Sequence, residues 1–170
     1  MTVSVKQAAQ VAELLGRKPR GLREVAVADA QGRPQVIRVA SLVESTPFPT
    51  LFWLVDPAFN YRIDREEASG LIARLQQQVD GDSALQAGMA ADHAAHIRLR
   101  DAYLSAEERA SLQRLGFVDV LRQRGIGGIA DFQRIRCLHT WYAAHLVVPN
   151  TIGGLLDAHW AAGVVAAGET

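Results

Sequence analysis

The sequence predicts an α+β fold in which a small antiparallel sheet in the N-terminal half is followed by a helix-dominated C-terminal half. β-leaning runs separated by turn residues are confined to residues 22–55. Later segments are longer and carry apolar residues at helical spacing. A length of 170 residues suits one domain with a sizeable core. We therefore expect a single domain over residues 1–170, with about three strands packed by four or more helices.

The first strands are expected to form a hairpin. An opening helix is predicted over residues 5–15, where apolar residues recur at helical spacing and Gly16 offers a left-handed cap. Two β-leaning runs follow at 22–28 and 35–42, and the turn residues at 31–34 between them indicate a hairpin.

The third strand and the helices come next. Residues 50–55 are apolar without alternation, which is typical of a strand covered on both faces, so we expect this strand to be central. Asp64 and Glu67 have the spacing of a capping box, which predicts a helix from there to about Val79. Four more helices are expected, over about residues 83–104, 106–115, 132–148 and 151–165.

Composition and charge exclude several classes of function. Eighteen basic and eighteen acidic side chains cancel, so no long-range field attracts nucleic acid or anionic lipid, and a basic site must be local. A single cysteine cannot form an internal disulfide, and the amino terminus lacks signal-peptide features, so a cytoplasmic location is expected. The most apolar stretch, Leu146 to Gly168, is interrupted by polar residues and predicts no membrane span.

Residues 124–139 combine three glycines, several arginines, the only cysteine and a histidine. The glycines allow a tight turn whose backbone N–H groups could converge on an anion. Nearby arginines could add bidentate contacts, with Arg122 and Arg124 close in sequence. The sequence therefore predicts a ligand-binding site at Gly125, Gly127, Gly128, Arg134, Arg136, His139 and Arg20. The alternative is a flexible connection between helices with solvated arginines.

Two pairs of titratable residues could support catalysis. Cys137 and His139 could act as nucleophile and base. Side chains two apart on a helix point about 200° apart, so this pair can meet only where the backbone is not helical, and we expect Cys137 to be a small core residue. Asp92 and His96, four apart on one helix face, could form a general acid/base pair or a structural ion pair.

No metal or cofactor is predicted from the residues. His93 and His96 could chelate an ion, but no third ligand is evident in the sequence. A ligand groove could be lined by His139, Tyr142 and His145 on one helix. Core packing or a homodimer contact explains these aromatic residues better.

Short motifs along the chain also carry a resemblance. They cover about residues 17–154 and comprise Arg17-Lys-Pro-Arg-Gly21, Thr46-Pro-Phe-Pro-Thr-Leu51, Ile63-Asp-Arg-Glu-Glu-Ala-Ser-Gly70, Gly125-Ile-Gly-Gly128, Arg136-Cys-Leu-His139, and Asn150 with Gly153. In this set and order the chain resembles the bacterial family known as domain of unknown function 501, which implies no particular reaction. Family members often carry further cysteines near residues 28–32 and 55–57, which this chain lacks. If those cysteines hold a metal together with the Cys137 to His139 segment elsewhere in the family, this chain has lost most of the ligands, so the resemblance predicts no zinc site here.

We therefore expect a cytoplasmic, non-catalytic or regulatory module that binds a small anionic ligand, such as a phosphorylated one, through residues 125–136. One alternative is a small hydrolase- or transferase-like enzyme that uses Cys137 with His139 or Asp92 with His96. The other is a protein-interaction domain that uses the helices of Trp141 and Trp160.

Overall fold

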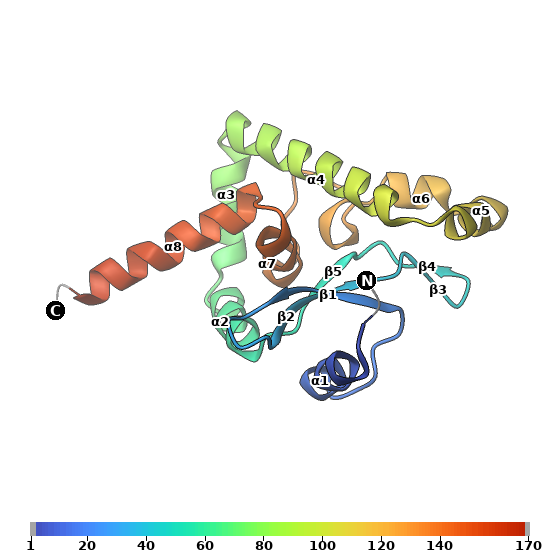
Figure 1. Cartoon of the computed structure of the whole chain (residues 1–170). Coiled ribbons are helices and arrows are strands. Elements are labelled where there is room, and N and C mark those ends of the chain that lie inside the picture. Colours follow the sequence, from blue (N-terminus) through green and yellow to red (C-terminus); the bar gives the residue numbers. More distant parts are fainter. Residues whose placement is uncertain (1–2, 169–170) are drawn as a thin grey trace.

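The computed structural model describes residues 3–168 and has the expected α+β architecture, with a small antiparallel sheet early in the chain and helices after it (Figure 1). Its main sheet has three strands, which are β1 (Leu22–Ala28), β2 (Pro34–Val39) and β5 (Phe52–Leu54). A separate two-stranded hairpin, β3 (Leu42–Val43) with β4 (Thr46–Pro47), lies between β2 and β5 in the chain.

The strand order β1-β2-β5 places β2 in the middle, with antiparallel pairing on both sides. The expectation that the 50–55 strand is central was therefore wrong. The apolar run has another cause. Phe52 and Leu54 of β5 belong to the large core cluster, while Trp53 packs with the smaller cluster, so an edge strand is covered on both faces.

Helix α1 (Val5–Leu15) and helix α7 (Leu138–Val147) cover opposite faces of the sheet (Figure 1). Successive residues of β2 point to opposite faces, so Val36 joins the cluster under α7 and Ile37 joins Val11 of α1. The predicted opening helix is confirmed, with Gly16 at its C-cap in the left-handed region.

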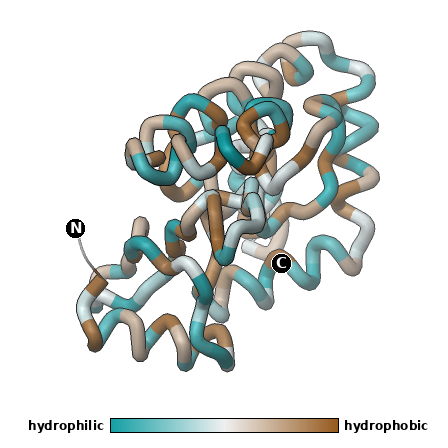
Figure 2. Tube along the Cα trace, turned by 90° about the vertical axis from the view of Figure 1, so that its right-hand side faces the viewer, coloured by the Kyte–Doolittle hydropathy of each residue, from teal (hydrophilic) through white to brown (hydrophobic). Residues whose placement is uncertain are grey.

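The remaining helices follow β5 in the chain. They are α2 (Pro57–Ala68), α3 (Leu71–Asp80), α4 (Ser83–Tyr103), α5 (Ala106–Leu115), α6 (Val118–Arg122) and α8 (Thr151–Gly168), with a short 3₁₀ turn, η1 (Ile126–Gly128), before α7. Figure 2 shows hydrophilic and hydrophobic residues interleaved along these helices, as expected of helices with one face in the core. The bounds of α4 and α5 match the sequence prediction closely.

The start of α2 differs from the prediction. Asp56 accepts hydrogen bonds from the N–H groups of Ala58 and Phe59, and Pro57 occupies the first helical position. The predicted capping box at Asp64 and Glu67 was wrong, because both residues lie inside a helix that had already begun. The helix also ends earlier, at Ala68, and α3 is a separate element.

The start of α7 also differs, since it begins at Leu138 rather than near 132. The backbone before it is held by other helices. The N–H of Ile135 donates to Gln76 Oε1 of α3 at 2.9 Å, and the N–H of Leu138 donates to Glu67 Oε1 of α2 at 2.8 Å. Because these bonds fix the chain in an irregular path, Cys137 has extended backbone angles, φ −148° and ψ 118°.

Helix α8 extends beyond the rest of the molecule at its C-terminal end (Figure 1). Its first half is anchored in the core by Ile152, Leu156 and Trp160, whereas Val164 and Val165 are exposed. Among residues 3–168, no helix combines the length and the apolar character that a membrane crossing requires.

Candidate functional site

The glycine segment at 125–128 is packed against other parts of the core. A Cβ atom at Gly125 would lie 2.1 Å from His93 Nδ1, and one at Gly127 would lie 2.5 Å from Thr140 Oγ1. The N–H groups of Gly125, Ile126 and Gly128 already donate to Ile129 O, His93 Nδ1 and Gly125 O, respectively. These glycines therefore allow close packing, and most of their backbone donors are not directed at an external anion.

The basic residues of the predicted anion site do not gather around that turn. Arg20 pairs with Glu44 at 3.1 Å on the surface. Arg134 lies 3.9 Å from Asp131 in an exposed pair, and Arg136 is exposed. Arg124 contributes its backbone carbonyl to a contact with Arg100. His139 takes part in a different cluster, described below.

Asp92 and His96 do not form the predicted pair. Asp92 Oδ2 accepts the N–H of Thr151 at 2.8 Å and thereby ties α4 to the first turn of α8. His96 is buried, and its Nε2 has no hydrogen-bond partner within residues 3–168. Burial lowers the pKa of His96 to about 3, and the charges of Arg100 and His93 act in the same direction. His96 is therefore a neutral core residue at physiological pH.

The aromatic residues of α7 serve packing, which was the preferred interpretation. Trp141 and Trp160 are both buried in the large core cluster. Tyr142 donates through its hydroxyl to Asp157 Oδ1 of α8 at 2.9 Å, and His145 Nε2 lies 2.9 Å from Asp157 Oδ2. These contacts join α7 to α8, and both tryptophans lie in the core between the helices and the sheet.

Cys137 and His139 do come together. The extended backbone at Cys137 turns its side chain so that Sγ lies 3.7 Å from His139 Nδ1. The helical geometry that was expected to separate the pair does not apply, because α7 begins one residue after Cys137. The prediction that a helix keeps these side chains apart was therefore wrong.

Two carboxylates of α2 complete this cluster. Glu67 Oε1 lies 3.3 Å from His139 Nδ1, and Asp64 Oδ1 lies 3.0 Å from His139 Nε2. Ligand atoms of Glu67, Cys137 and His139 all lie within 4.8 Å of one another. Among the described residues, this is the one group of histidine, cysteine and acidic side chains with the spacing of a metal site.

The cluster shifts the acidity of its members. The contact with Cys137 raises the pKa of His139 to about 9 against the opposing effect of burial, and the charges of Glu67 and Asp64 add to the increase. Burial acts to raise the pKa of the Cys137 thiol, but the contacts with His139 and the Thr140 backbone outweigh it, so this pKa lies below its ordinary value. In the absence of a metal, the geometry favours a thiolate beside an imidazolium.

Sequence reasoning missed Glu67 and Asp64 as site residues. Both were assigned to helix capping because of their spacing, and nothing local connects them to a segment about seventy positions later. The available signal was their i, i+3 spacing. It puts both carboxylates on one face of any helix that contains them.

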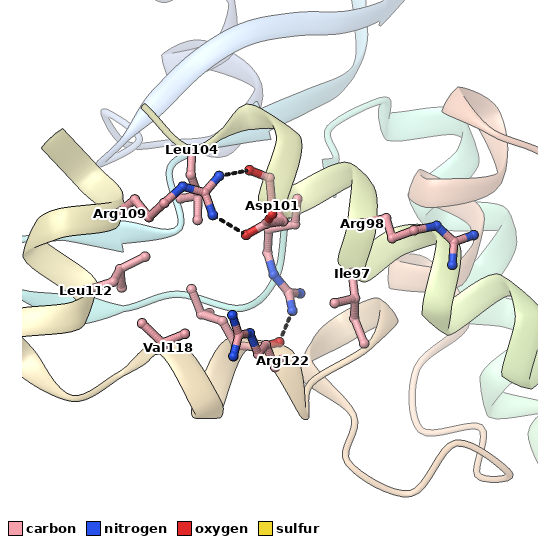
Figure 3. A pocket seen from close by; sticks show the side chains of 10 residues that line it. Ile97, Arg98, Asp101, Leu104, Arg109, Leu112, Val118 and Arg122 are labelled. Atoms are coloured by element: carbon pink, nitrogen blue, oxygen red, sulfur yellow. Dashed lines mark hydrogen bonds and ion pairs between the residues drawn. The ribbon is translucent and has the colours of Figure 1, made fainter. Parts of the chain in front are cut away.

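A second feature is a cavity of about 210 Å³ bounded by α4, α5 and α6. Four arginines and one acidic residue line it, together with apolar side chains: Arg98, Arg100, Asp101, Arg109, Arg122, Ile97, Leu104, Leu112, Val118 and Leu121. In Figure 3, Arg109 bonds to Asp101 at one side of the cavity and Arg122 lies at another side, while the guanidinium of Arg98 points away from both.

Arg100 is the unusual member of this cavity, since it is only 1% exposed. Its guanidinium donates to the carbonyl oxygens of Pro49, Leu121 and Arg124. No carboxylate within residues 3–168 forms an ion pair with it. Burial lowers the pKa of Arg100 to about 10, with the charge of Asp101 opposing this effect, so it remains a cation at neutral pH.

Comparison with known proteins gives a family. A family model described as "Protein of unknown function (DUF501)" matches residues 25–158. The chain belongs to this family. No curated protein and no solved structure matches the chain. The DUF501 match spans both features described above, the cluster around His139 and the arginine-lined cavity.

Proposed function

We propose that this DUF501 protein is a non-catalytic or regulatory module that binds a small organic anion in the cavity between α4, α5 and α6. The observation that carries the proposal is Arg100, a buried cation at the cavity wall that donates to carbonyl oxygens and forms no ion pair within residues 3–168. Buried charges are normally paired, because desolvation of an unpaired ion is costly. An anion in the cavity would supply the missing partner.

Arg122 supports the same proposal from the rim. Its side chain lines the cavity and has no ion-pair partner in the described part of the chain. Arg109 is already paired with Asp101 at 2.7 Å, so it contributes less. A carboxylate or phosphate held by Arg122 would therefore bring negative charge next to the buried guanidinium of Arg100.

The walls indicate what the rest of the ligand is like. Leu104, Leu112, Val118 and Leu121 are apolar, so they favour an apolar group attached to the anion. The volume of about 210 Å³ is smaller than the roughly 300–1,000 Å³ of typical ligand pockets. The proposed ligand class is therefore a small carboxylate or phosphate ester with a short apolar body.

This proposal keeps the anionic ligand expected from the sequence but moves its site. The predicted site at Gly125, Gly127 and Gly128 offers few free backbone donors, since the N–H groups of Gly125, Ile126 and Gly128 bond within the protein. The arginine-lined cavity has cations without a matching number of acids, in a chain with no net charge. Local excess charge of this kind supports an anion site.

Thermal unfolding tests the proposal, with butyrate and inorganic phosphate as separate probes. At about 100 times its dissociation constant a ligand adds roughly 2.7 kcal/mol to the free energy of unfolding, which raises the melting temperature by several degrees. We expect butyrate, phosphate or both to produce this shift in the wild type. Arg122→Gln should abolish it without unfolding the chain, because Arg122 is exposed.

The matched control is Arg136→Gln, which removes an exposed arginine of the glycine segment and should leave the shift intact. Chloride at equal ionic strength controls for screening. The cavity site is contradicted if neither probe moves the melting temperature of the wild type, or if the shift survives Arg122→Gln. Loss of the shift in Arg136→Gln alone would return the anion site to the glycine segment.

A second candidate function is favoured by one observation, the 3.7 Å separation of Cys137 Sγ and His139 Nδ1 with Asp64 on the far nitrogen of the ring. A thiol beside an imidazole that is held by a carboxylate is the arrangement of cysteine nucleophiles. This enzyme alternative requires rapid alkylation of Cys137 at neutral pH in the folded protein.

A further inference from the structure

Glu67, Cys137 and His139 lie where the C-terminal end of α2 meets the start of α7. Their side chains are partly buried, with 27% of the Glu67 side chain and 23% of the His139 side chain exposed. The three supply a carboxylate oxygen, a thiol sulfur and an imidazole nitrogen, which are the donor types of protein zinc sites.

Two of the three distances between these donor atoms match tetrahedral coordination. Zinc bonds of about 2.3 Å to sulfur and 2.0–2.2 Å to nitrogen and oxygen, at tetrahedral angles, separate sulfur from nitrogen by about 3.6 Å and nitrogen from oxygen by about 3.4 Å. The corresponding distances here are 3.7 Å from Cys137 Sγ to His139 Nδ1 and 3.3 Å from His139 Nδ1 to Glu67 Oε1. His139 therefore lies at coordination spacing from both other ligands, and the ligand atoms of all three residues lie within 4.8 Å of one another.

Two of the proposed ligands are oriented by further contacts, as metal ligands in proteins commonly are by groups that hydrogen-bond to them. Asp64 Oδ1 lies 3.0 Å from His139 Nε2, so the ring can donate there while Nδ1 stays available to a metal. Glu67 Oε1 accepts the Leu138 N–H at 2.8 Å, which fixes the carboxylate against the first turn of α7. His139 and Glu67 are thus each held in place by a group other than the three ligands.

The charges also indicate a missing cation. The cluster holds two carboxylates and a thiol against one imidazole. Neither Asp64 nor Glu67 pairs with a lysine or arginine within residues 3–168. A divalent ion would balance this excess of negative charge.

The geometry points to a divalent metal site formed by Glu67 Oε1, Cys137 Sγ and His139 Nδ1, with Asp64 as the positioning residue for His139. A thiolate with an imidazole selects zinc and its chemical neighbours such as cobalt over magnesium or calcium. Three protein ligands leave a fourth position on the solvent-exposed side for water or another small ligand. The site is independent of the arginine-lined cavity, which lies between other helices.

The site also explains why Cys137 is better suited to ligation than to nucleophilic attack. Glu67 Oε1 lies beside the same nitrogen of His139 that faces Cys137, so a base at this position would be shared between a thiol and a carboxylate. A metal uses all three donors at once.

Cobalt binding to the full chain, purified with a chelator and dialysed, tests the site. We expect one equivalent of Co²⁺, visible tetrahedral bands and a sulfur-to-cobalt charge-transfer band, all displaced by Zn²⁺. Because Cys137 is the only cysteine, the charge-transfer band reports on this residue alone. Cys137→Ser should remove that band. Glu67→Gln should weaken Co²⁺ binding at least about tenfold, while the amide oxygen can still accept the Leu138 N–H and keep the fold.

Two variants make the test specific. Glu66→Gln is the matched control, because the neighbouring Glu66 contacts His159 and Trp160 rather than the cluster, and it should bind Co²⁺ like the wild type. Asp64→Asn should weaken binding about 10- to 100-fold yet keep the charge-transfer band, since Asp64 acts through His139. Circular dichroism checks that each variant is folded.

The metal site is overturned if Co²⁺ gives no charge-transfer band, or if Glu67→Gln and Glu66→Gln bind Co²⁺ equally well. Alkylation of Cys137 supplies a second readout, and Zn²⁺ should slow it. Rapid alkylation at the same rate with and without Zn²⁺ would also overturn the site and would favour the cysteine enzyme instead.

Discussion

At the scale of single residues, the two buried histidines of α4 show how far a position in the fold can change a side chain. Burial lowers the pKa of His93 to about 4 and that of His96 to about 3, from about 6.5 in an unfolded chain. His93 Nδ1 accepts the N–H of Ile126, whereas the Nε2 of His96 has no partner within residues 3–168. The sequence offered Asp92 and His96 as a candidate catalytic or structural pair, because helical spacing does not show which neighbour a carboxylate prefers.

These shifts predict a dependence of stability on pH. Between the folded pKa and about 6.5, the unfolded chain binds more protons than the native protein, so the free energy of unfolding falls as pH is lowered from 6.5 towards 4. Above pH 6.5 these histidines do not make the free energy of unfolding depend on pH. In His96→Met, the loss between pH 7 and 4.5 should be smaller than in the wild type by on the order of 2 kcal/mol.

Urea unfolding at both pH values measures this difference. At pH 7 the variant should stay within about 1.5 kcal/mol of the wild type, because methionine has a similar volume and the buried, unpartnered nitrogen is removed. If His96→Met loses as much stability as the wild type on acidification, His96 does not titrate in this way.

At the scale of elements, the helices were predicted well where a local signal decides their ends and poorly where another element does. Helix α4 follows its own apolar spacing and an N-cap at Asp82. Helix α7 starts later in the chain than predicted, because side chains of α2 and α3 accept hydrogen bonds from the backbone before and at its first residue. No local pattern contains that information. The meeting of Cys137 with His139 follows directly from this late start.

The contact between α4 and the turn η1 leads to a second prediction. Gly125→Ala should destabilise the protein by more than about 2 kcal/mol, because its Cβ would overlap His93 and disturb the hydrogen bond from Ile126. Gly154→Ala is the matched control. A Cβ at Gly154 meets nothing within 4 Å, so alanine there should stabilise α8 by roughly 0.5–1 kcal/mol.

Denaturant unfolding of the two variants gives the comparison. Equal stability of Gly125→Ala and the wild type would mean that the turn is not packed against α4, and would restore its interpretation as an open anion-binding loop.

At the scale of the whole molecule, composition and periodicity predicted the α+β class and the order of strands before helices, because these depend on patterns within each segment. They did not predict the sites. The arginine-lined cavity needs α4, α5 and α6 to meet, and the cluster around His139 needs α2 beside α7. Each depends on residues distant in sequence, so its members carry no common local signal.

The distribution of charge also becomes meaningful only in the folded molecule. Basic and acidic residues cancel along the chain, yet the fold separates them into a cavity with more arginines than acids and a cluster with more acids than cations. The first suits an anion and the second a cation. Both sites lie within residues 25–158, the part of the chain that matches DUF501.

The most direct test of the proposed function is a crystal structure of the full chain grown with butyrate or phosphate. It should show the anion between α4, α5 and α6, with an oxygen within hydrogen-bond distance of Arg122 and its charge next to Arg100. Density for the anion at the backbone of Gly125 to Gly128, or a cavity without the anion in a crystal where the probe binds elsewhere, would contradict the account.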